Sequence, residues 1–190
     1  RPPRSTLCPY TTLFRSRGRQ PAPSPVKQSA LKLGIDVFQP ERINTEEAAA
    51  TFVSLEPDFY VVTAYGQILS QRLLDIPRIY PVNIHASLLP RYRGPSPVQA
   101  AILNMDTMTG VTTIVMQKAM DKGDILMSAQ TPLSDRDTTQ DLHDRLALMG
   151  ADLIVKTIRA VLKDNIQPVP QAESRATYVK MLTKSDGQIN

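Results

Sequence analysis

An asparagine and a histidine lie two residues apart at the end of an apolar run, in the sequence NIH at residues 83–85. Side chains of a strand alternate between its two faces, so Asn83 and His85 would project to the same side, followed by Ser87 if the strand continues. A carboxamide offers hydrogen-bond donors, and an imidazole offers a proton near neutral pH. Together they could bind a developing oxyanion. The alternative is a histidine held structurally by hydrogen bonds, and the spacing alone does not exclude it.

The segments around this pair predict an α/β protein with a doubly wound, mostly parallel sheet. Apolar β-rich runs alternate with helical patterns over the first half of the chain, which is typical of parallel strands. The last two strands precede one long helix, so one edge of the sheet could instead be antiparallel. Such sheets place active sites at the carboxyl ends of strands, where NIH and TAYG (63–66) fall. The predicted strands span 35–38, 58–65, 80–85, 110–118 and 123–130, and the predicted helices span 25–33, 45–55, 70–75, 95–104 and 139–163.

The charge of the chain does not by itself argue for nucleic-acid binding. The formal net charge is +4, but residues 1–19 hold five arginines and no acid, which leaves 17 basic against 18 acidic side chains in the remainder. The single cysteine excludes an internal disulfide framework and a cysteine-based zinc cluster. No apolar run approaches the roughly 18–20 residues that span a bilayer, so we expect a cytoplasmic enzyme.

The first sixteen residues differ in character from the rest. Residues 6–16 read TLCPYTTLFRS, which resembles the translation of a common DNA-sequencing adaptor. We therefore predict that residues 1–16 derive from library DNA and are not part of the evolved fold. The alternative is a natural disordered tail. Under the adaptor interpretation, Cys8 has no functional role.

Longer motifs connect the Asn-x-His pair to a known family. Residues 83–102 read NIHASLLPRYRGPSPVQAAI, and residues 109–126 read TGVTTIVMQKAMDKGDIL. They resemble the pattern of folate-dependent formyltransferases, which is Asn-x-His, Ser-Leu-Leu-Pro, a basic glycine loop and a later Asp-x-Gly turn. Within that superfamily the chain most resembles the methionyl-tRNA formyltransferase family, over roughly residues 17–190. Further matching segments are PSPVK (23–27), GIDVFQP (34–40), VVTAYGQIL (61–69) and ATYVKMLTKSDGQIN (176–190).

The resemblance implies a fold and a reaction. It implies a Rossmann-like formyltransferase catalytic domain over residues 17–164, incomplete at its N-terminus. The implied reaction moves a formyl group from 10-formyltetrahydrofolate to the α-amino group of initiator methionyl-tRNA, without a metal. Asn83 and His85 would stabilise the oxyanion, and Asp121 would orient and charge His85. Asp124 is a nearby alternative acid that the family pattern disfavours.

The resemblance also places binding residues around this core. Arginines of two loops are expected to meet tRNA phosphate or, in the second loop, a folate carboxylate. These are Arg17 and Arg19 in the first loop and Arg91 and Arg93 in the second. The predicted folate pocket is lined by Ala64, Tyr65, Gly66, Ser87, Leu88, Leu89 and Pro90.

Simpler interpretations stay open for several of these residues. Tyr65 also fits a core aromatic, and Ser87 also fits a residue that caps the turn. Arg91 and Arg93 also fit solvated loop charges. His143, on the long helix, is predicted to be a surface residue.

The family pattern extends beyond both ends of this sequence. It begins with a glycine-containing strand–helix unit where residues 1–16 stand, and it continues past a linker, predicted here at 165–190, into a tRNA-binding domain. We expect the complete protein to be a monomer of a bacterial cytoplasm or an organelle, and this chain alone to be poorly stable and inactive. Two other functions stay open: a sugar-nucleotide N-formyltransferase with the same core and folate donor, and a noncatalytic remnant of the fold.

Overall fold

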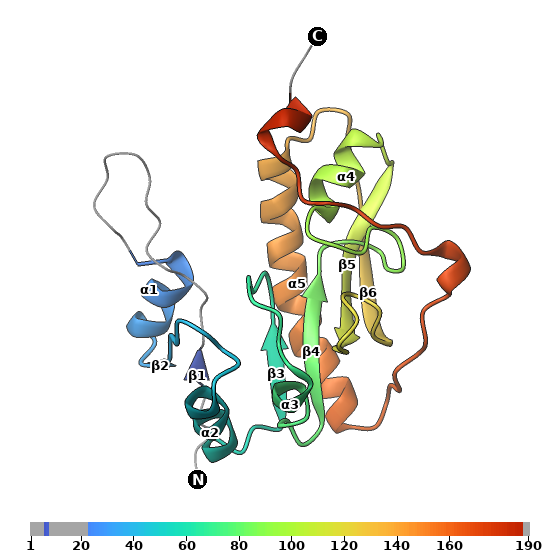
Figure 1. Cartoon of the computed structure of the whole chain (residues 1–190). Coiled ribbons are helices and arrows are strands. Elements are labelled where there is room, and N and C mark those ends of the chain that lie inside the picture. The colour runs from blue at the N-terminus through green and yellow to red at the C-terminus, as the bar shows by residue number, and fades with distance from the viewer. Residues whose placement is uncertain (1–5, 8–22, 188–190) are drawn as a thin grey trace. The chain divides into compact units, whose positions relative to one another are not determined.

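The computed structural model of the chain describes residues 6–7 and 23–187 (Figure 1). The described residues fall into two compact units. Unit 1 contains the residues up to Pro57 together with Ala64–Arg78, and unit 2 contains Asp58–Thr63 and the chain from Ile79 onward. None of the helices within these ranges has both the length and the apolar character that crossing a membrane requires.

Unit 1 contains three helices and two short strands within the described residues. Helix α1 starts after Ser24, whose hydroxyl oxygen accepts the backbone N–H of Lys27 at 3.2 Å. It stops before Gly34, whose φ of 66° suits a residue without a Cβ. Both ends of α1 agree with the helix predicted at 25–33. The elements are β1 (Thr6–Leu7), α1 (Pro25–Lys32), β2 (Asp36–Val37), α2 (Glu46–Ser54) and α3 (Gln71–Leu74).

The two strands of unit 1 pair in parallel. Residue Thr6 lies opposite Asp36, and Leu7 lies opposite Val37. Strand β1 falls within the segment that we predict to be adaptor-derived, and the other residues of that segment lie outside the described ranges. The origin of the segment stays a prediction.

Unit 2 is a four-stranded mixed sheet with helices packed against it. The strand order is β3-β4-β5-β6, in which β3 and β4 are parallel and the other two pairs are antiparallel. The elements are β3 (Phe59–Val62), β4 (Tyr80–His85), α4 (Pro97–Leu103), β5 (Met108–Val115), β6 (Ile125–Pro132) and α5 (Thr139–Leu162).

The α/β class is confirmed, but the antiparallel share of the sheet is larger than predicted. Parallel neighbours need a crossover of a dozen or more residues. The connection 116–124 between β5 and β6 is shorter, so the chain turns back as a hairpin. Strand β5 also runs antiparallel to β4, so among the four strands of this sheet β3 and β4 form the parallel pair.

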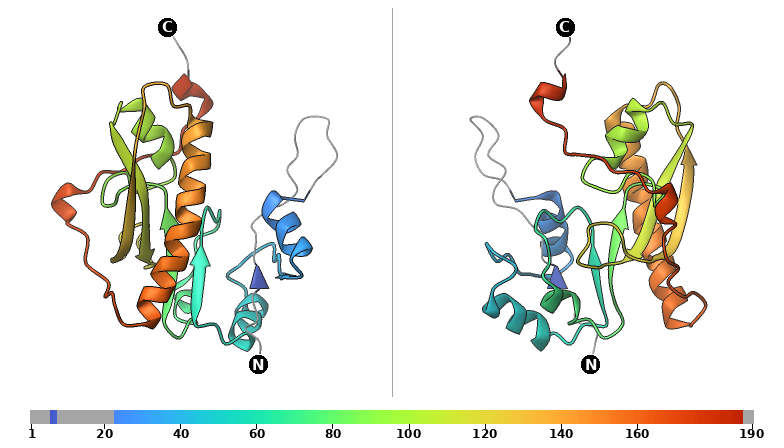
Figure 2. Two further views of the ribbon diagram at one scale, coloured as in Figure 1. Left: turned by 180° about the vertical axis from the view of Figure 1, so that it is seen from behind. Right: turned by 45° about the vertical axis from the view of Figure 1, so that its right-hand side comes forward.

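Helix α5 runs along the sheet of unit 2 (Figure 2). A capping box forms at its N-terminus. The Thr138 hydroxyl oxygen accepts the Asp141 N–H at 3.2 Å, and the Asp141 carboxylate accepts the Thr138 N–H at 3.0 Å. Its apolar face then packs on β5 and α4. The buried residues of this core are Val98, Val111, Leu142, Leu146 and Leu153.

The segment after α5 runs back along unit 2 (Figure 1). Residue Val169 exchanges two backbone hydrogen bonds with Ile125, at 2.8 and 2.9 Å, and Tyr178 forms a parallel bridge with Arg93. Two short 3-10 turns, Glu173–Arg175 and Lys184–Gly187, interrupt it. The segment predicted to be a linker therefore makes defined contacts with the sheet and with the loop after β4. What it leads to stays a prediction.

We expect Leu142→Ala to lower the free energy of unfolding by about 2–5 kcal/mol, because a fully buried leucine leaves a cavity when truncated. Leu148→Ala is the matched control on the same helix. The Leu148 side chain is 74% exposed, so its truncation should change the free energy of unfolding by less than about 0.5 kcal/mol. Urea unfolding followed by circular dichroism measures both, and equal losses would contradict the packing of α5.

Candidate active site

Strand β4 carries Asn83 and His85 between two neighbouring strands. Residue Asn83 lies opposite Val62 of β3 and Ile114 of β5, and His85 lies opposite Thr112 of β5. Because their separation is two residues, both side chains lie on one face of the sheet. His85 is buried, whereas Asn83 is half-buried, and its carboxamide has no hydrogen bond to any residue that the structure describes. The pair therefore combines a fixed imidazole with a carboxamide that can accept a new partner.

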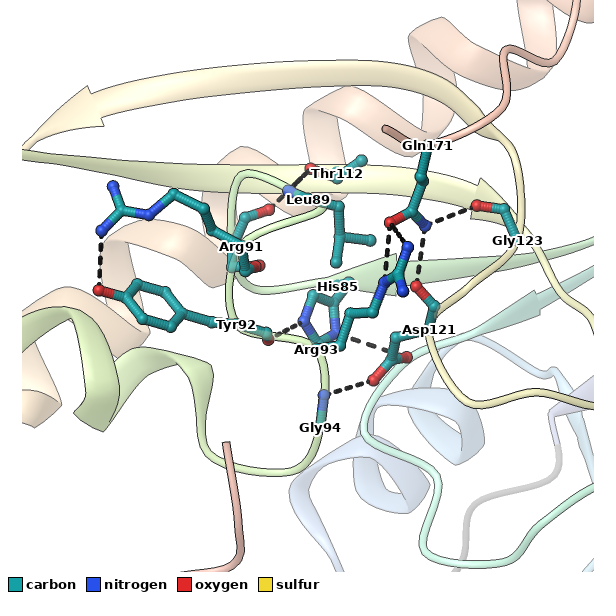
Figure 3. A network of polar contacts seen from close by, with 11 residues as sticks. His85, Leu89, Arg91, Tyr92, Arg93, Gly94, Thr112, Asp121, Gly123 and Gln171 are labelled. Atoms are coloured by element: carbon teal, nitrogen blue, oxygen red, sulfur yellow. Dashed lines mark hydrogen bonds and ion pairs between the residues drawn. The ribbon is translucent and has the colours of Figure 1, made fainter. Parts of the chain in front are cut away.

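The imidazole of His85 has an oxygen acceptor near each ring nitrogen (Figure 3). Nε2 lies 2.8 Å from the carbonyl oxygen of Tyr92, and because a carbonyl only accepts, Nε2 carries a proton. Nδ1 lies 3.7 Å from Oδ1 of Asp121, which is an ion-pair distance but too long for a hydrogen bond. Nδ1 is therefore the nitrogen that remains for proton exchange with the carboxylate or with a reacting group.

Asp121 is held in the turn between β5 and β6. Its φ of 54° lies in the left-handed region, which residues other than glycine rarely adopt. Its side chain is 12% exposed, and Oδ2 accepts the backbone N–H of Gly94 at 2.8 Å. The alternative acid, Asp124, is bound through its backbone carbonyl to the N–H of Val115. Within the described residues, Asp121 is the carboxylate paired with His85.

The loop after β4 is closed by hydrogen bonds to Thr112 of β5. The Thr112 hydroxyl donates to the carbonyl oxygen of Ser87 at 2.7 Å and accepts the N–H of Leu89 at 3.1 Å. The Ser87 hydroxyl donates to the carbonyl oxygen of Arg91 at 2.6 Å, and the Leu89–Pro90 peptide is cis. These bonds fix the backbone that presents the Tyr92 carbonyl to His85.

Ser87 exposes no surface in this structure, and its predicted folate contact stays a prediction. The residue is 0% exposed and its hydroxyl is used inside the loop, which agrees with the simpler turn interpretation. Leu89 is also buried. Leu88 and Pro90 are half-buried and keep surface for the predicted pocket.

Arg93 is a buried structural cation, and its predicted contact with tRNA phosphate or folate carboxylate stays a prediction. Its side chain is 0% exposed, and all five guanidinium donors have partners. Nε and Nη2 donate to Oε1 of Gln171 at 3.0 and 2.9 Å. Nη1 and Nη2 donate to the Glu173 carboxylate at 3.1 and 2.9 Å, and Nη1 also donates to the Tyr178 hydroxyl at 2.8 Å. The hydrogen bond between Arg93 and Glu173 raises the pKa of Arg93 and lowers the pKa of Glu173.

Arg91 points away from this network and stays a candidate for substrate contact. Its side chain is 50% exposed, and Nη2 donates to both carboxylate oxygens of Asp106, at 2.8 and 3.0 Å, and to the Tyr92 hydroxyl at 2.9 Å. The hydrogen bond to Asp106 raises the pKa of Arg91. Arg17 and Arg19 lie outside the described residues, so their predicted phosphate contacts stay predictions.

Three predicted pocket residues follow β3 in the chain and belong to unit 1. Ala64, at φ 45°, and Gly66 are exposed. Tyr65 is half-buried and packs against the core of unit 1, as the simpler interpretation expects. A role of the three in a folate pocket stays a prediction. The buried residues of that core are Ile43, Ala49 and Leu73.

Sequence patterns do not single out two other residues that build this site, Thr112 and Gln171. The glycine of the basic loop, Gly94, donates its N–H to Asp121, and Thr112 closes the loop. Gln171 donates to the carbonyl oxygens of Asp121 and Gly123, at 2.8 and 2.7 Å. Gln171 lies in a proline-rich segment without periodicity, and Thr112 lies within a β-rich run. The resemblance to the tail motif of the family is the one signal near Gln171.

The arrangement is suited to charge stabilisation and proton transfer. It offers an unbonded carboxamide, a buried imidazole and a carboxylate next to it. In the part of the chain that the structure describes, no group of three or more His, Cys, Asp or Glu side chains is placed to hold a metal ion.

A family model described as "Formyl transferase" matches residues 11–158. The chain belongs to the formyl transferase family. The match covers β4, the loop after it and the turn that carries Asp121, so the three central residues all lie within the family domain. The Rossmann-like α/β class predicted from the sequence agrees with this membership.

Two relatives of this chain are named methionyl-tRNA formyltransferase. The protein of Synechocystis sp. is 46% identical over 177 residues, which cover 93% of this chain and 54% of the relative. The protein of Methylacidiphilum infernorum is 47% identical over 174 residues, which cover 92% and 54%. The chain spans about half the length of the curated relatives it matches. A solved sugar N-formyltransferase from Shewanella sp. matches with a TM-score of 0.66 over 83% of this chain and 60% of that chain, and its 24% identity shows the fold alone.

We expect Gly94→Ala to separate the loop from the tail segment. At φ 112° an L-residue is strained, and a Cβ here would overlap the carbonyl oxygen of Val179. Because the Val179 N–H donates to the Arg93 carbonyl at 2.8 Å, its hydrogen exchange should accelerate by about tenfold or more.

Gly34→Ala is the matched control for Gly94→Ala. It has a similar strained φ of 66°, but a Cβ there meets nothing within 4 Å. It should leave the exchange of the Val179 amide unchanged. An unchanged Val179 amide in Gly94→Ala would contradict the close approach of the tail to the loop.

Proposed function

We propose that this chain carries the catalytic site of a methionyl-tRNA formyltransferase, which moves a formyl group from 10-formyltetrahydrofolate to the α-amino group of initiator methionyl-tRNA. The observation that carries the proposal is the buried His85 ring, with the Asp121 carboxylate 3.7 Å from Nδ1 and Asn83 on the same strand face. The relatives of that name, at 46% and 47% identity, support the choice of acceptor.

The reaction requires charge stabilisation and the movement of one proton. The α-amino nitrogen forms a bond to the formyl carbon, and the bond between that carbon and N10 of the folate breaks. Starting from the neutral amine, the amine loses one proton and N10 gains one, so this transfer neither consumes nor releases protons. An α-amino group has an unperturbed pKa near 8, so about a tenth is neutral and nucleophilic at pH 7.

Asn83 is the proposed donor to the formyl oxygen. Its carboxamide is half-buried and has no hydrogen bond to the described residues, so binding an oxyanion there displaces no protein partner. A donor fixed on a central strand needs little reorganisation when negative charge develops, which is the condition for effective oxyanion stabilisation.

His85 is proposed to act through Nδ1. Nε2 is held by the Tyr92 carbonyl, so a proton on Nδ1 can be donated to the oxyanion, with the Asp121 carboxylate at ion-pair distance. His85 and Asp121 then provide a path for the proton from the amine toward N10.

The formyl donor and the tRNA are proposed to approach from the loop after β4. Leu88 and Pro90 keep exposed surface for the folate, and residues 64–66 of unit 1 are proposed as further folate contacts. Arg91, with its half-exposed guanidinium, is proposed to meet tRNA phosphate, as are Arg17 and Arg19.

A sugar-nucleotide N-formyltransferase is the second candidate, because the same three residues would formylate a sugar amine by the same chemistry. The observation in its favour is the likeness to the solved Shewanella enzyme, which at 24% identity shows the fold alone. The higher identity to methionyl-tRNA formyltransferases favours the tRNA acceptor.

In the protein expressed from its complete gene, Asn83→Ala and His85→Ala should each lower kcat for methionyl-tRNA formylation by on the order of a hundredfold. His143→Ala is the matched control, because His143 is the other histidine of the chain and its side chain is 67% exposed on α5. It should keep wild-type turnover. Mass spectrometry of the methionine released from tRNA measures the product.

Two results would contradict this proposal in different ways. Wild-type turnover in His85→Ala would overturn the catalytic assignment. Formylation of an amino-sugar nucleotide without formylation of methionyl-tRNA would overturn the acceptor and support the second candidate.

A further inference from the structure

The carboxamide of Gln171 joins the Asp121 turn to the buried Arg93 (Figure 3). Its Nε2 donates to the carbonyl oxygens of Asp121 and Gly123, at 2.8 and 2.7 Å. Its Oε1 accepts from Nε and Nη2 of Arg93, at 3.0 and 2.9 Å. A carboxamide has two N–H donors and one oxygen with two lone pairs. Every hydrogen-bonding position of Gln171 is therefore used, and the two ends of the group hold two different segments.

The Asp121 turn depends on such outside support. Asp121 adopts a φ of 54°, a conformation that persists in residues other than glycine when the surroundings fix it. The turn also leaves the carbonyls of Asp121 and Gly123 facing the tail, where a buried carbonyl without a donor is costly. Gln171 satisfies both with one rigid amide group.

The other partners of Arg93 do not hydrogen-bond to the backbone of this turn, although the centroid of the Tyr178 ring lies 5.9 Å from Nζ of Lys122 in the turn. Glu173 and Tyr178 bind the guanidinium, and among the described residues neither is hydrogen-bonded to Asp121 or Gly123. Among the described residues of the tail, Gln171 is therefore the side chain that hydrogen-bonds both to Arg93 and to the backbone of the Asp121 turn.

We propose that Gln171 is a positioning residue for Asp121. It fixes the turn so that the carboxylate stays against the His85 ring and the Gly94 amide. The proposal deepens the proposed function, on which its kinetic consequence rests. It also assigns a role in the reaction to a segment that sequence patterns indicate as a linker.

The variant Gln171→Glu tests the donor side of the amide. A glutamate keeps the length and the acceptor for Arg93, but it lacks both N–H groups and places oxygen against the two carbonyls. The Gly94 N–H donates to Asp121 Oδ2 at 2.8 Å, so its hydrogen exchange reports the position of the carboxylate. We expect this exchange to accelerate about tenfold or more in Gln171→Glu, while the amides of β5 keep their protection.

Glu173→Gln is the matched control. It alters another partner of Arg93 in the same tail segment and leaves the bonds of Gln171 in place. The exchange of the Gly94 amide should then stay at the wild-type rate. Gln171→Met serves as a second test variant, because it removes the polar group without adding charge, and it should reproduce the faster exchange.

The kinetic test compares the change in kcat with the change in KM. With the complete protein, Gln171→Glu should lower kcat about tenfold and leave KM for the folate and for methionyl-tRNA unchanged, since Gln171 acts on the reacting groups through Asp121. In an Asp121→Asn background the Gln171→Glu change should cause no further loss of kcat, because both changes remove the same function.

Three results would overturn the positioning role. They are unchanged Gly94 exchange in both Gln171 variants, the same acceleration in Glu173→Gln, and multiplicative losses of kcat in the double variant. If the wild-type protein does not formylate methionyl-tRNA, the proposed function fails. The exchange measurement on Gly94 then still decides whether Gln171 holds Asp121.

Discussion

The placement of the His85 ring between a backbone carbonyl and a carboxylate is the constraint on which the rest of the site depends. The Tyr92 carbonyl takes the Nε2 proton, and this leaves Nδ1 toward Asp121. Neither acceptor comes from the strand that carries the histidine. One belongs to the loop after β4 and the other to the turn between β5 and β6, so the site exists when both segments are held against β4.

Two buried polar groups hold these segments. Thr112 fixes the start of the loop, and Arg93 fixes its end to the tail. A guanidinium with 0% exposure is tolerated because all five donors have partners, and removing a partner leaves a buried unpaired charge. Gln171 then extends this network to the carbonyl of Asp121. The loop, the tail and the turn are thus stabilised together, which favours one geometry of the imidazole and the carboxylate.

The elements and the central pair could be predicted because their signals are local. Alternation and length indicate β4 as Tyr80–His85, and the period of a strand places Asn83 and His85 on one face. The cap residues Ser24 and Thr138 mark helix starts by type and position. The approach of Asp121 to His85 came from family resemblance, because spacing does not show which turn returns to which strand.

The partners of the loop residues could not be predicted for the same reason. Arg93 looks like a solvated or phosphate-binding charge in a Pro/Gly loop, but its partners lie 78 to 85 residues later in a segment without periodicity. The burial of Ser87 depends on the loop closing on Thr112, 25 residues away in the sequence. The sheet likewise has more antiparallel pairing than predicted, because the strand pattern does not show in which direction the chain runs after the connection 116–124.

The measurement that tests the central claim most directly is nitrogen NMR of the His85 ring in histidine-labelled protein, with His143→Ala to assign the signals. At about pH 9, above the ordinary titration range of histidine, the account predicts a proton on Nε2, held by the Tyr92 carbonyl. A ring with an unprotonated Nε2 would contradict it, because the carbonyl would then face a lone pair and Nδ1 would not be free to serve the reaction.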